Sequence, residues 1–302
     1  MASEIKGMVC VLQHTDAVFF GAHDGQVHAV DIARRVPLWT HRVASEGHAS
    51  SAVFAGVTLD EPRGVLVCAT LVGRVQALCY SGPRDPTELT TDAPRLSPPI
   101  RTAPPSLLWE QQLPLPVFGT PAVHPVTGHI LVPCVDGSLY CLGPQGSTIW
   151  RCALDGPVFS SPLLLVAAAQ GDEAGGLQDP TRPVARTLAV VGTHSGSLAA
   201  VCLADGSVAW QTQLGATVYS SPTLLTIASA GAERCAVAAT SAGLLVLVGL
   251  GDGVVQASLQ LPGLAFASPV VVGTSVFQGC RDDHVHRIDV ATGPGRKYWR
   301  DR

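Results

Sequence analysis

The chain has 302 residues, of which 47% are hydrophobic, 5% aromatic and 14% charged, and this apolar content excludes an intrinsically disordered chain. Its 31 glycines and 23 prolines are too few for a collagen-like sequence and indicate many short segments separated by turns. The net charge of −4, with only two lysines, excludes a basic surface for nucleic acid, so we expect no nucleic-acid partner.

Signals for membranes and secretion are missing from the sequence. The longest apolar runs fall far short of the roughly 18 residues needed to cross a bilayer, and the first ten residues carry Glu4 and Lys6 instead of an apolar signal-peptide core. The nine cysteines form no CxxC pair, and most lie in apolar segments, as Cys68, Cys134 and Cys202 do. We interpret them as small buried residues in a reducing compartment. We therefore expect a cytoplasmic protein without a membrane partner.

Pairs of short apolar segments recur along the chain, and a turn ending in Gly or Asp joins the two members of each pair. In chain order the pairs are AVFFGAHDG and QVHAVDI (17–32), GVLVCATLVG and RVQALCY (64–80), GHILVPCVDG and SLYCLGPQG (128–146), TLAVVGTHSG and SLAAVCLADG (187–206), CAVAATSAG and LLVLVGLGDG (235–253), and SVFQGCRDD and HVHRIDVATG (275–293). Alternation with period two and Asp-Gly or Ser-Gly turns are typical of β-hairpins. The sequence therefore predicts strands throughout.

A short phrase, often Ser-Ser-Pro, opens most copies. It occurs as Ser50-Ser51-Ala52, Gly119-Thr120-Pro121, Ser160-Ser161-Pro162, Ser220-Ser221-Pro222 and Ala267-Ser268-Pro269. Its second residue recurs at intervals of 69, 41, 60 and 47, and the two long intervals contain insertions, so the period is 41–47 residues. Helical arrays and four-stranded propeller blades share such a period. Because no helical stripe is sustained, we expect a single all-β propeller over residues 1–302, with about six four-stranded blades.

Two residue types mark fixed places in each predicted blade. Glycines hold the tight turn between the second and third strands: Gly25, Gly73, Gly137, Gly196 and Gly243. Tryptophans recur on the fourth strand: Trp39, Trp109, Trp150 and Trp210. A large flat ring at that place fills the wedge between neighbouring blades, and a platform for stacking a ligand is the alternative. The fifth copy has Ala257 there, and we assign Trp299 to the last copy.

Other segments predict loops. The proline-containing insertion 83–105 and the insertion 170–186, with glycine and acidic residues, indicate surface loops. His124 and His129 flank a Pro-Val-Thr-Gly turn, and we expect both to be exposed to solvent.

Catalytic motifs are missing. The sequence has no GxSxG elbow and no P-loop, so we assign no catalytic or cofactor-binding residue and expect no cofactor. Weak candidate metal ligands are Asp282, Asp283, His284 and His286. In a strand, His284 and His286 would face the same side. Asp282 and His286 also fall where Asp24 and His28 fall in the first copy, so they are equally interpreted as ordinary turn and strand residues.

The ordered elements resemble propeller repeats of the pyrroloquinoline-quinone (PQQ) type. The phrases FFGAHDGQVHAVDI, VFSSP, VPCVDGSLYCL, LPGLAFASPVVV and GCRDDHVHRIDV more closely resemble the C-terminal propeller of the beta-alanine-activating enzymes. This family is also described as aminoadipate-semialdehyde dehydrogenase homologues within the acyl-CoA synthetases. The resemblance covers nearly the whole chain. It implies a PQQ-like ring of seven or eight blades, and about six copies leave open whether the ring closes and whether the chain is a fragment.

In that family an adenylating domain and an acyl-carrier domain precede the propeller. The resemblance implies a longer protein that acts as an ATP-dependent acid–thiol ligase and loads an amino or carboxylic acid onto a phosphopantetheine thiol. This chain shows neither an adenylation loop nor a carrier serine in a helical setting. We therefore expect a non-catalytic module that binds a protein partner or the adenylation and carrier domains of the parent enzyme. The alternatives are a quinone- or metal-dependent oxidoreductase, although the vicinal cysteine pair of quinone enzymes is missing, and an assembly scaffold.

Overall fold

Six separate antiparallel sheets of four strands make up the protein. The computed structural model describes residues 3–12, 15–43, 52–80, 104–166, 187–227, 233–290 and 299–301. Within these ranges the only helix is a single 3₁₀ turn, η1 (Glu61–Arg63), and none has the length and hydropathy needed to span a membrane. The predicted all-β class and the six four-stranded blades are confirmed. The predicted loops 83–105 and 170–186 lie outside the described residues, apart from 104 and 105.

Each sheet uses four consecutive strands. The first has β1 (Cys10–Val11), β2 (Ala17–Gly21), β3 (Gln26–Asp31) and β4 (Val36–Arg42), and the second has β5 (Thr58–Asp60), β6 (Val65–Ala69), β7 (Arg74–Cys79) and β8 (Ser106–Gln112). The third has β9 (Ala122–Val123), β10 (Ile130–Cys134), β11 (Ser138–Leu142) and β12 (Thr148–Ala153), and the fourth has β13 (Leu163–Leu165), β14 (Leu188–Gly192), β15 (Ser197–Cys202) and β16 (Val208–Gln213). The fifth has β17 (Thr223–Ile227), β18 (Glu233–Ala239), β19 (Leu244–Gly249) and β20 (Val255–Gln260), and the sixth has β21 (Val270–Val272), β22 (Ser275–Gly279), β23 (Val285–Val290) and β24 (Trp299–Asp301).

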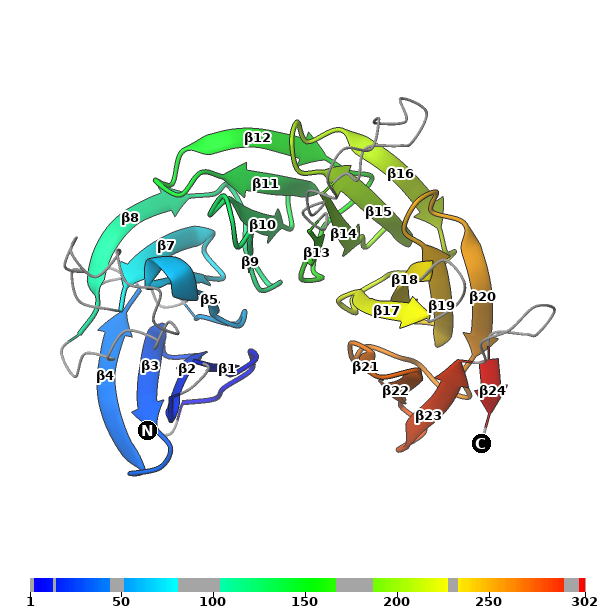
Figure 1. Ribbon diagram of the computed structural model, residues 1–302, viewed down its shortest axis with the longest axis horizontal. Coiled ribbons are helices and arrows are strands. Elements are labelled where there is room, and N and C mark those ends of the chain that lie inside the picture. The colour runs from blue at the N-terminus through cyan, green and yellow to red at the C-terminus, as the bar shows by residue number, and fades with distance from the viewer. Residues whose placement is uncertain are drawn as a thin grey trace, which may run out of the picture.

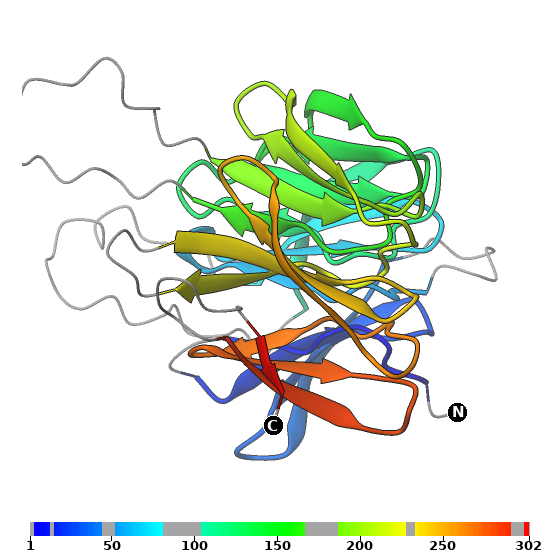
Figure 2. The same ribbon diagram turned by 90° about the vertical axis from the view of Figure 1, so that its right-hand side faces the viewer.

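The sheets lie side by side in an arc, with the first strand of each sheet innermost and the fourth outermost (Figure 1). Seen from the side, every sheet is twisted, as sheets of L-residues are (Figure 2). The arc remains open between the first and the sixth sheets, with the two chain ends on opposite sides of the opening (Figure 1). Among the described strands, none from one end of the chain completes the sheet at the other end.

The core is divided among the boundaries between sheets. Five apolar clusters each join residues of two consecutive sheets, from the first pair to the fifth. Alternation along the strands accounts for this, because one face of a sheet points to the preceding sheet and the other to the following one. The arrangement is that of a repeat protein, in which each unit buries its apolar side chains only against its neighbours.

The glycines of the predicted turns lie between the second and third strands of five sheets, in the left-handed region of backbone space. Their φ angles are +78° for Gly25, +78° for Gly73, +83° for Gly137, +86° for Gly196 and +83° for Gly243. At Gly73 a Cβ atom would also lie only 2.6 Å from the Leu113 carbonyl oxygen. The sixth sheet has Asp283 at this position, with φ of +66°, a conformation that Asp tolerates better than most residues.

Tryptophan rings lie between neighbouring sheets. The Nε1–H groups of Trp109, Trp150 and Trp210 donate to the carbonyl oxygens of Pro144, Leu203 and Leu250 in the next sheet. Each ring also lies against a glycine of that sheet, which leaves no room for a side chain there. On the fourth strands, Trp39, Trp109, Trp150 and Trp210 pair with the fourth residue of the third strand.

The last two copies differ at the tryptophan place. Ala257 pairs with Leu247, so it holds that place in the fifth sheet, as the sequence indicates. Trp299 does lie on the fourth strand of the sixth sheet, but it does not hold the tryptophan place. Trp299 pairs with Val290 at the end of β23, whereas the residue equivalent to the partners of the other tryptophans is Arg287. The shift of three residues arises because the short strand β24 begins at Trp299.

The Ser-Ser-Pro phrase connects consecutive sheets through a chain of hydrogen bonds. The backbone N–H of Thr120 donates to Ser161 Oγ, that of Ser161 to Ser221 Oγ, and that of Ser221 to Ser268 Oγ, at 2.8–2.9 Å. At the start of the chain of bonds, the N–H of Gly56 donates to Thr120 Oγ1 at 2.9 Å. The first copy of the phrase therefore lies at Ala55-Gly56-Val57. Ser50 and Ser51, to which the sequence assigned this copy, lie outside the described residues, and a glycine without a hydroxyl stands at the equivalent place.

Candidate functional site

A row of aromatic rings follows the segments that enter the innermost strands. We call it the aromatic rim, and its members are Phe54, Phe118, Phe159, Tyr219 and Phe266. Consecutive ring centroids lie 5.3, 5.2, 5.4 and 5.7 Å apart. All five side chains are at least partly exposed. Rings at these distances stabilise each other, and their open faces can stack planar or cationic groups.

Polar residues from the turns between second and third strands border the aromatic rim. His194 lies 5.8 Å from Phe159 and 5.6 Å from Tyr219, measured between ring centroids. The guanidinium carbon of Arg281 lies 4.6 Å from the centroid of Phe266, a cation–π contact. The rim was missed in the sequence analysis, although an aromatic residue precedes the small and hydroxyl residues of every copy from the second to the sixth.

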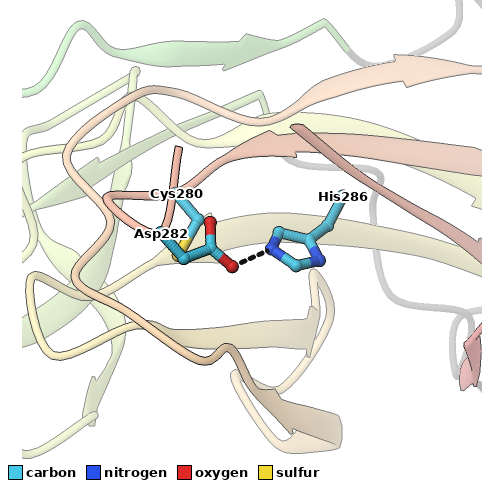
Figure 3. A group of neighbouring side chains, drawn as sticks. All are labelled: Cys280, Asp282 and His286. Carbon is cyan, nitrogen blue, oxygen red and sulfur yellow. Dashed lines mark hydrogen bonds and ion pairs between the residues drawn. The ribbon is translucent and has the colours of Figure 1, made fainter. Parts of the chain in front are cut away.

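The turn between β22 and β23 brings together a thiol, a carboxylate and an imidazole. The ligand atoms of Cys280, Asp282 and His286 all lie within 4.8 Å of one another, and no other such group of three occurs among the described residues. Figure 3 shows the three side chains converging from the turn and from the start of β23. All three are half-buried. We call them the Cys-Asp-His cluster.

Asp282 is the centre of this cluster. Its Oδ2 lies 2.8 Å from His286 Nε2, and its Oδ1 accepts the backbone N–H of His284 at 3.2 Å. Desolvation raises the pKa of the Asp282 carboxyl, but hydrogen bonds from His286, Cys280 and the His284 N–H together hold that pKa below its usual value. The carboxylate is therefore held ionised between two groups that can also bind metals.

The four predicted metal candidates are not all brought together. Asp282 and His286 belong to the cluster, whereas Asp283 occupies the left-handed turn position and is exposed. His284 is also exposed, with its ring nitrogen Nδ1 2.6 Å from the backbone oxygen of Asp282. Cys280 was not predicted, because cysteines in and beside apolar segments indicate small buried residues rather than metal ligands. The spacing Cys-x-Asp-x₃-His across a hairpin turn is the signal that could have found it.

The equivalent turn of the first sheet carries Ala22, Asp24 and His28. The alignment of Asp24 with Asp282 and of His28 with His286 follows from the same turn hydrogen bonds, from Ala22 N–H to Gln26 O and from Cys280 N–H to His284 O. Asp24 and His28 lie 3.9 Å apart, and alanine stands in place of the thiol.

Two further predictions concern isolated residues. His124 is buried, so the expectation that it faces solvent is wrong, and His129 is half-buried. His124 Nδ1 accepts the backbone N–H groups of Val126 and Thr127, which turns the ring inward. Burial lowers the pKa of His124, and the nearby His129 and Arg63 lower it further.

All nine cysteines are free, and burial raises the pKa of Cys68 to about 12.

The radial arrangement of six twisted four-stranded sheets, each packed against its neighbours, defines the class of β-propellers. Solved structures of this class resemble the chain. BamB from Moraxella catarrhalis is 12% identical, with a TM-score of 0.54, and the alignment covers 94% of this chain and 82% of that one. The WD40 propeller domain of Doa1 is 13% identical, with a TM-score of 0.58, covering 96% and 79% of the two chains. At these identities the likeness concerns the fold alone.

The sequence model of one family, described as "Beta-alanine-activating enzyme, beta-propeller", matches residues 1–290. The chain therefore belongs to the β-propeller family of the beta-alanine-activating enzymes, and the predicted relationship is confirmed. Comparison with curated protein sequences finds no match. A further structural relative is the computationally designed Ika8 protein, 15% identical with a TM-score of 0.60 over 94% of this chain and 70% of that one.

Proposed function

We propose that the chain is a non-catalytic propeller module of a beta-alanine-activating protein, and that it binds a protein partner through the outer faces of its two end sheets. The partner that we propose is the adenylation and carrier part of the longer protein. The module would then hold that part in place, while the ATP-dependent loading of an acid onto a thiol takes place outside the propeller. The proposal rests on family membership and on apolar side chains that the two end sheets leave uncovered.

In the sixth sheet, apolar side chains are exposed at positions that are buried in the other five sheets. The second residue of the third strand is completely buried in the first five sheets, as Val27, Val75, Leu139, Leu198 and Leu245. Each of these side chains belongs to the apolar cluster with the following sheet. In the sixth sheet β23 begins one residue later, and the equivalent residue, two after the turn residue Asp283, is Val285, which is 71% exposed. Val272 on β21 is 64% exposed and points to the same face.

The first sheet leaves the opposite face open. The second residue of its second strand, Val18, is half-buried, whereas the equivalent residues of the other five sheets are fully buried. Phe20 and His28 on the same face stack on each other, with ring centroids 5.2 Å apart and planes inclined by 17°. Exposed apolar patches of this kind mark sites of protein association. Because these positions form sheet-to-sheet contacts elsewhere in the arc, we propose an apolar surface of the adenylation and carrier part as the occupant.

Binding to a purified adenylation–carrier segment of a beta-alanine-activating enzyme tests the proposal. Wild-type propeller should bind it, and a V272K/V285K variant should bind at least tenfold more weakly, because a charge must be desolvated in an apolar contact. Val126 is 72% exposed but lies away from the end faces, so V126K is the matched control and should bind as the wild type does. Failure of the wild type to bind, or unchanged binding by V272K/V285K, would contradict the proposal. Self-association in place of binding would assign the faces to a second copy and also contradict it.

The non-catalytic part of the proposal has its own test. The isolated chain should show no ATP–pyrophosphate exchange with any amino or carboxylic acid, and a robust exchange rate would refute it. We also propose that residues 1–302 act as one domain in the reducing cytoplasm. Nine free cysteines, several of them with pKa values raised by burial, support a reducing environment.

A further inference from the structure

We propose that Cys280, Asp282 and His286 form a zinc-binding site in the sixth sheet. This inference is independent of the proposed partner binding, because it concerns the boundary between the fifth and sixth sheets and not the open face. One Zn²⁺ ion would bind the Cys280 thiolate, an Asp282 carboxylate oxygen and a His286 ring nitrogen. A water molecule would complete four-coordination at this half-buried place.

The geometry of the three side chains requires little change to accept the ion. Zinc binds nitrogen and oxygen at roughly 2.0–2.2 Å and sulfur at about 2.3 Å, so tetrahedral ligand atoms lie about 3.3–3.6 Å apart. The three ligand atoms already lie within 4.8 Å of one another. His286 Nε2 and Asp282 Oδ2 are 2.8 Å apart, so insertion of the ion opens this pair by about half an ångström. A small rotation of the two side chains is sufficient.

The donor set selects the kind of metal. A thiolate with an imidazole is a typical set of ligands for zinc and other borderline-soft cations, whereas Ca²⁺ and Mg²⁺ prefer sites made of oxygen atoms alone. The three residues are also spaced within seven residues of chain across one hairpin turn. The turn thus supplies all three protein ligands without help from another part of the molecule.

The surroundings hold the turn in place. The backbone N–H of Arg281 donates to the Leu264 carbonyl oxygen at 2.9 Å, which fixes the turn to the segment that precedes the sixth sheet. In that segment Gly263 lies so close that a Cβ atom there would be 3.1 Å from Cys280 Sγ. Ligands that are held by a rigid neighbouring structure lose little freedom when they bind an ion.

A buried amide oxygen provides a second, independent observation. Gln278 pairs directly with His286 across β22 and β23, so the two side chains are on the same face of the sheet. Gln278 is completely buried, and its Nε2 donates to the carbonyl oxygens of Ala267 and Gly279. Its Oε1 has no hydrogen-bond partner among the described residues. Because such an atom is costly to bury alone, it indicates that a water molecule lies beside it, on the face of the sheet from which His286 projects.

Comparison of the six turns shows that the combination is specific to the sixth. All six turns are described, and the first has Ala22, Asp24 and His28, lacking the thiol. The third has Cys134 and Asp136 but places Tyr140 at the position of the histidine, where its hydroxyl donates to Asp136. The first and third turns therefore form with only two of the three residue types. The presence of cysteine, aspartate and histidine together in the sixth turn favours a metal-binding role.

Titration of the full chain with Zn²⁺ against a chromophoric chelator tests the site, together with Co²⁺ as a spectroscopic substitute. The wild type should bind one equivalent of Zn²⁺, and its Co²⁺ complex should show a thiolate-to-metal charge-transfer band. The substitutions C280A, D282A and H286A introduce residues that stand at the same positions in other sheets, namely Ala22, Ala242 and Ala199. Each should fold, by circular dichroism, and each should lower the affinity for Zn²⁺ at least tenfold. C280A should also abolish the charge-transfer band.

Two control variants complete the experiment. H284A removes a neighbouring exposed imidazole, and C134A removes the cysteine at the equivalent position of the third sheet. Both should bind Zn²⁺ as the wild type does. The proposal is overturned if the wild type binds no Zn²⁺, if C280A binds it as tightly as the wild type, or if H284A or C134A weakens binding as much as H286A.

Discussion

Val75 and Val285 occupy equivalent positions in the second and the sixth sheets, each two residues after the left-handed turn residue, Gly73 or Asp283, that precedes the third strand. Val75 is completely buried against the third sheet, whereas Val285 is 71% exposed. Residue type, strand and register are identical, so the presence of a following sheet is the difference between them. Comparing the two valines therefore shows how much burial one boundary between sheets provides. It also shows that the described sheets end at the sixth.

Alanine substitutions at these two positions should differ sharply in stability. V75A removes two buried methyl groups and leaves a cavity, so it should lower the free energy of unfolding by about 2 kcal/mol. V285A removes methyl groups that solvent already reaches, and should change the free energy of unfolding by no more than about 0.5 kcal/mol. Urea denaturation of the two variants checks the difference. Equal losses would mean that the face of the sixth sheet is covered in solution.

The number and kind of sheets could be predicted because each copy carries its own signals. A hairpin glycine such as Gly137 and a strand tryptophan such as Trp150 recur with a common spacing. The failures occurred where a copy replaces the marker residue. Gly56 donates its backbone N–H to Thr120 without having a hydroxyl of its own, so the first copy of the phrase was misplaced. The register of Trp299 depends on where β24 begins, which no local pattern specifies.

The contact between Trp150 and Gly206 should show what the tryptophan place contributes. A Cβ at Gly206 would lie 2.8 Å from the Trp150 ring, and the residue has φ of +74°. Gly215 has φ of +84° but no atom within 4 Å of such a Cβ, so G215A should cost only about 1 kcal/mol of backbone strain. G206A should cost about 1–3 kcal/mol more because of overpacking.

A double-mutant cycle with W150A isolates this contact from the backbone strain. In the W150A background, G206A should lower the free energy of unfolding by no more than G215A does. The effect of G215A should be the same with and without the ring. Additive effects of W150A and G206A, measured by denaturant unfolding, would show that the ring does not press on the glycine.

His124 should make the stability of the protein depend on pH. Burial lowers its pKa in the folded state, so the unfolded chain binds more protons once the pH falls below the ordinary histidine pKa of about 6.5. The neutral ring's contribution to the free energy of unfolding is thus fully present above a pH of about 6.5. It is lost as the pH falls through the lowered pKa of the folded state. In H124N the amide oxygen can still accept the N–H groups of Val126 and Thr127, but it does not titrate.

Urea midpoints at pH 7.5 and pH 5.5 measure this effect. The wild type should lose more stability than H124N over the interval, because other groups titrate equally in both proteins. Parallel losses would show that His124 does not supply the pH dependence.

The candidate sites were only partly predictable. Asp282 and His286 were recognised as titratable residues near a turn, but Cys280 acquires its role from a hairpin that folds it back toward them. His124 stands beside a Pro-Val-Thr-Gly turn, and its burial accompanies hydrogen bonds from the turn residues Val126 and Thr127 that composition does not reveal. Exposure of Val285 depends on the absence of a following sheet among the described residues, which its own alternating strand cannot indicate.

We expect the chain not to bind PQQ, so adding this quinone should not change its thermal stability. A ligand that binds only the folded state raises stability by about 2.7 kcal/mol at a hundred times its dissociation constant, so a real site is easily detected. Because the sequence has no vicinal cysteine pair, PQQ with Ca²⁺ should not change the melting temperature. A clear increase at saturating PQQ and Ca²⁺ would favour the oxidoreductase alternative over the binding module.

The most direct test of the open end face is the reactivity of a cysteine placed at position 285. Alkylation of V285C, followed by peptide mass spectrometry, should proceed at least tenfold faster than alkylation of L245C, whose position is covered by the sixth sheet. Addition of the adenylation–carrier segment should protect V285C. If V285C reacts as slowly as L245C in the isolated chain, or reacts equally fast with the segment bound, the face is not the binding surface that we propose.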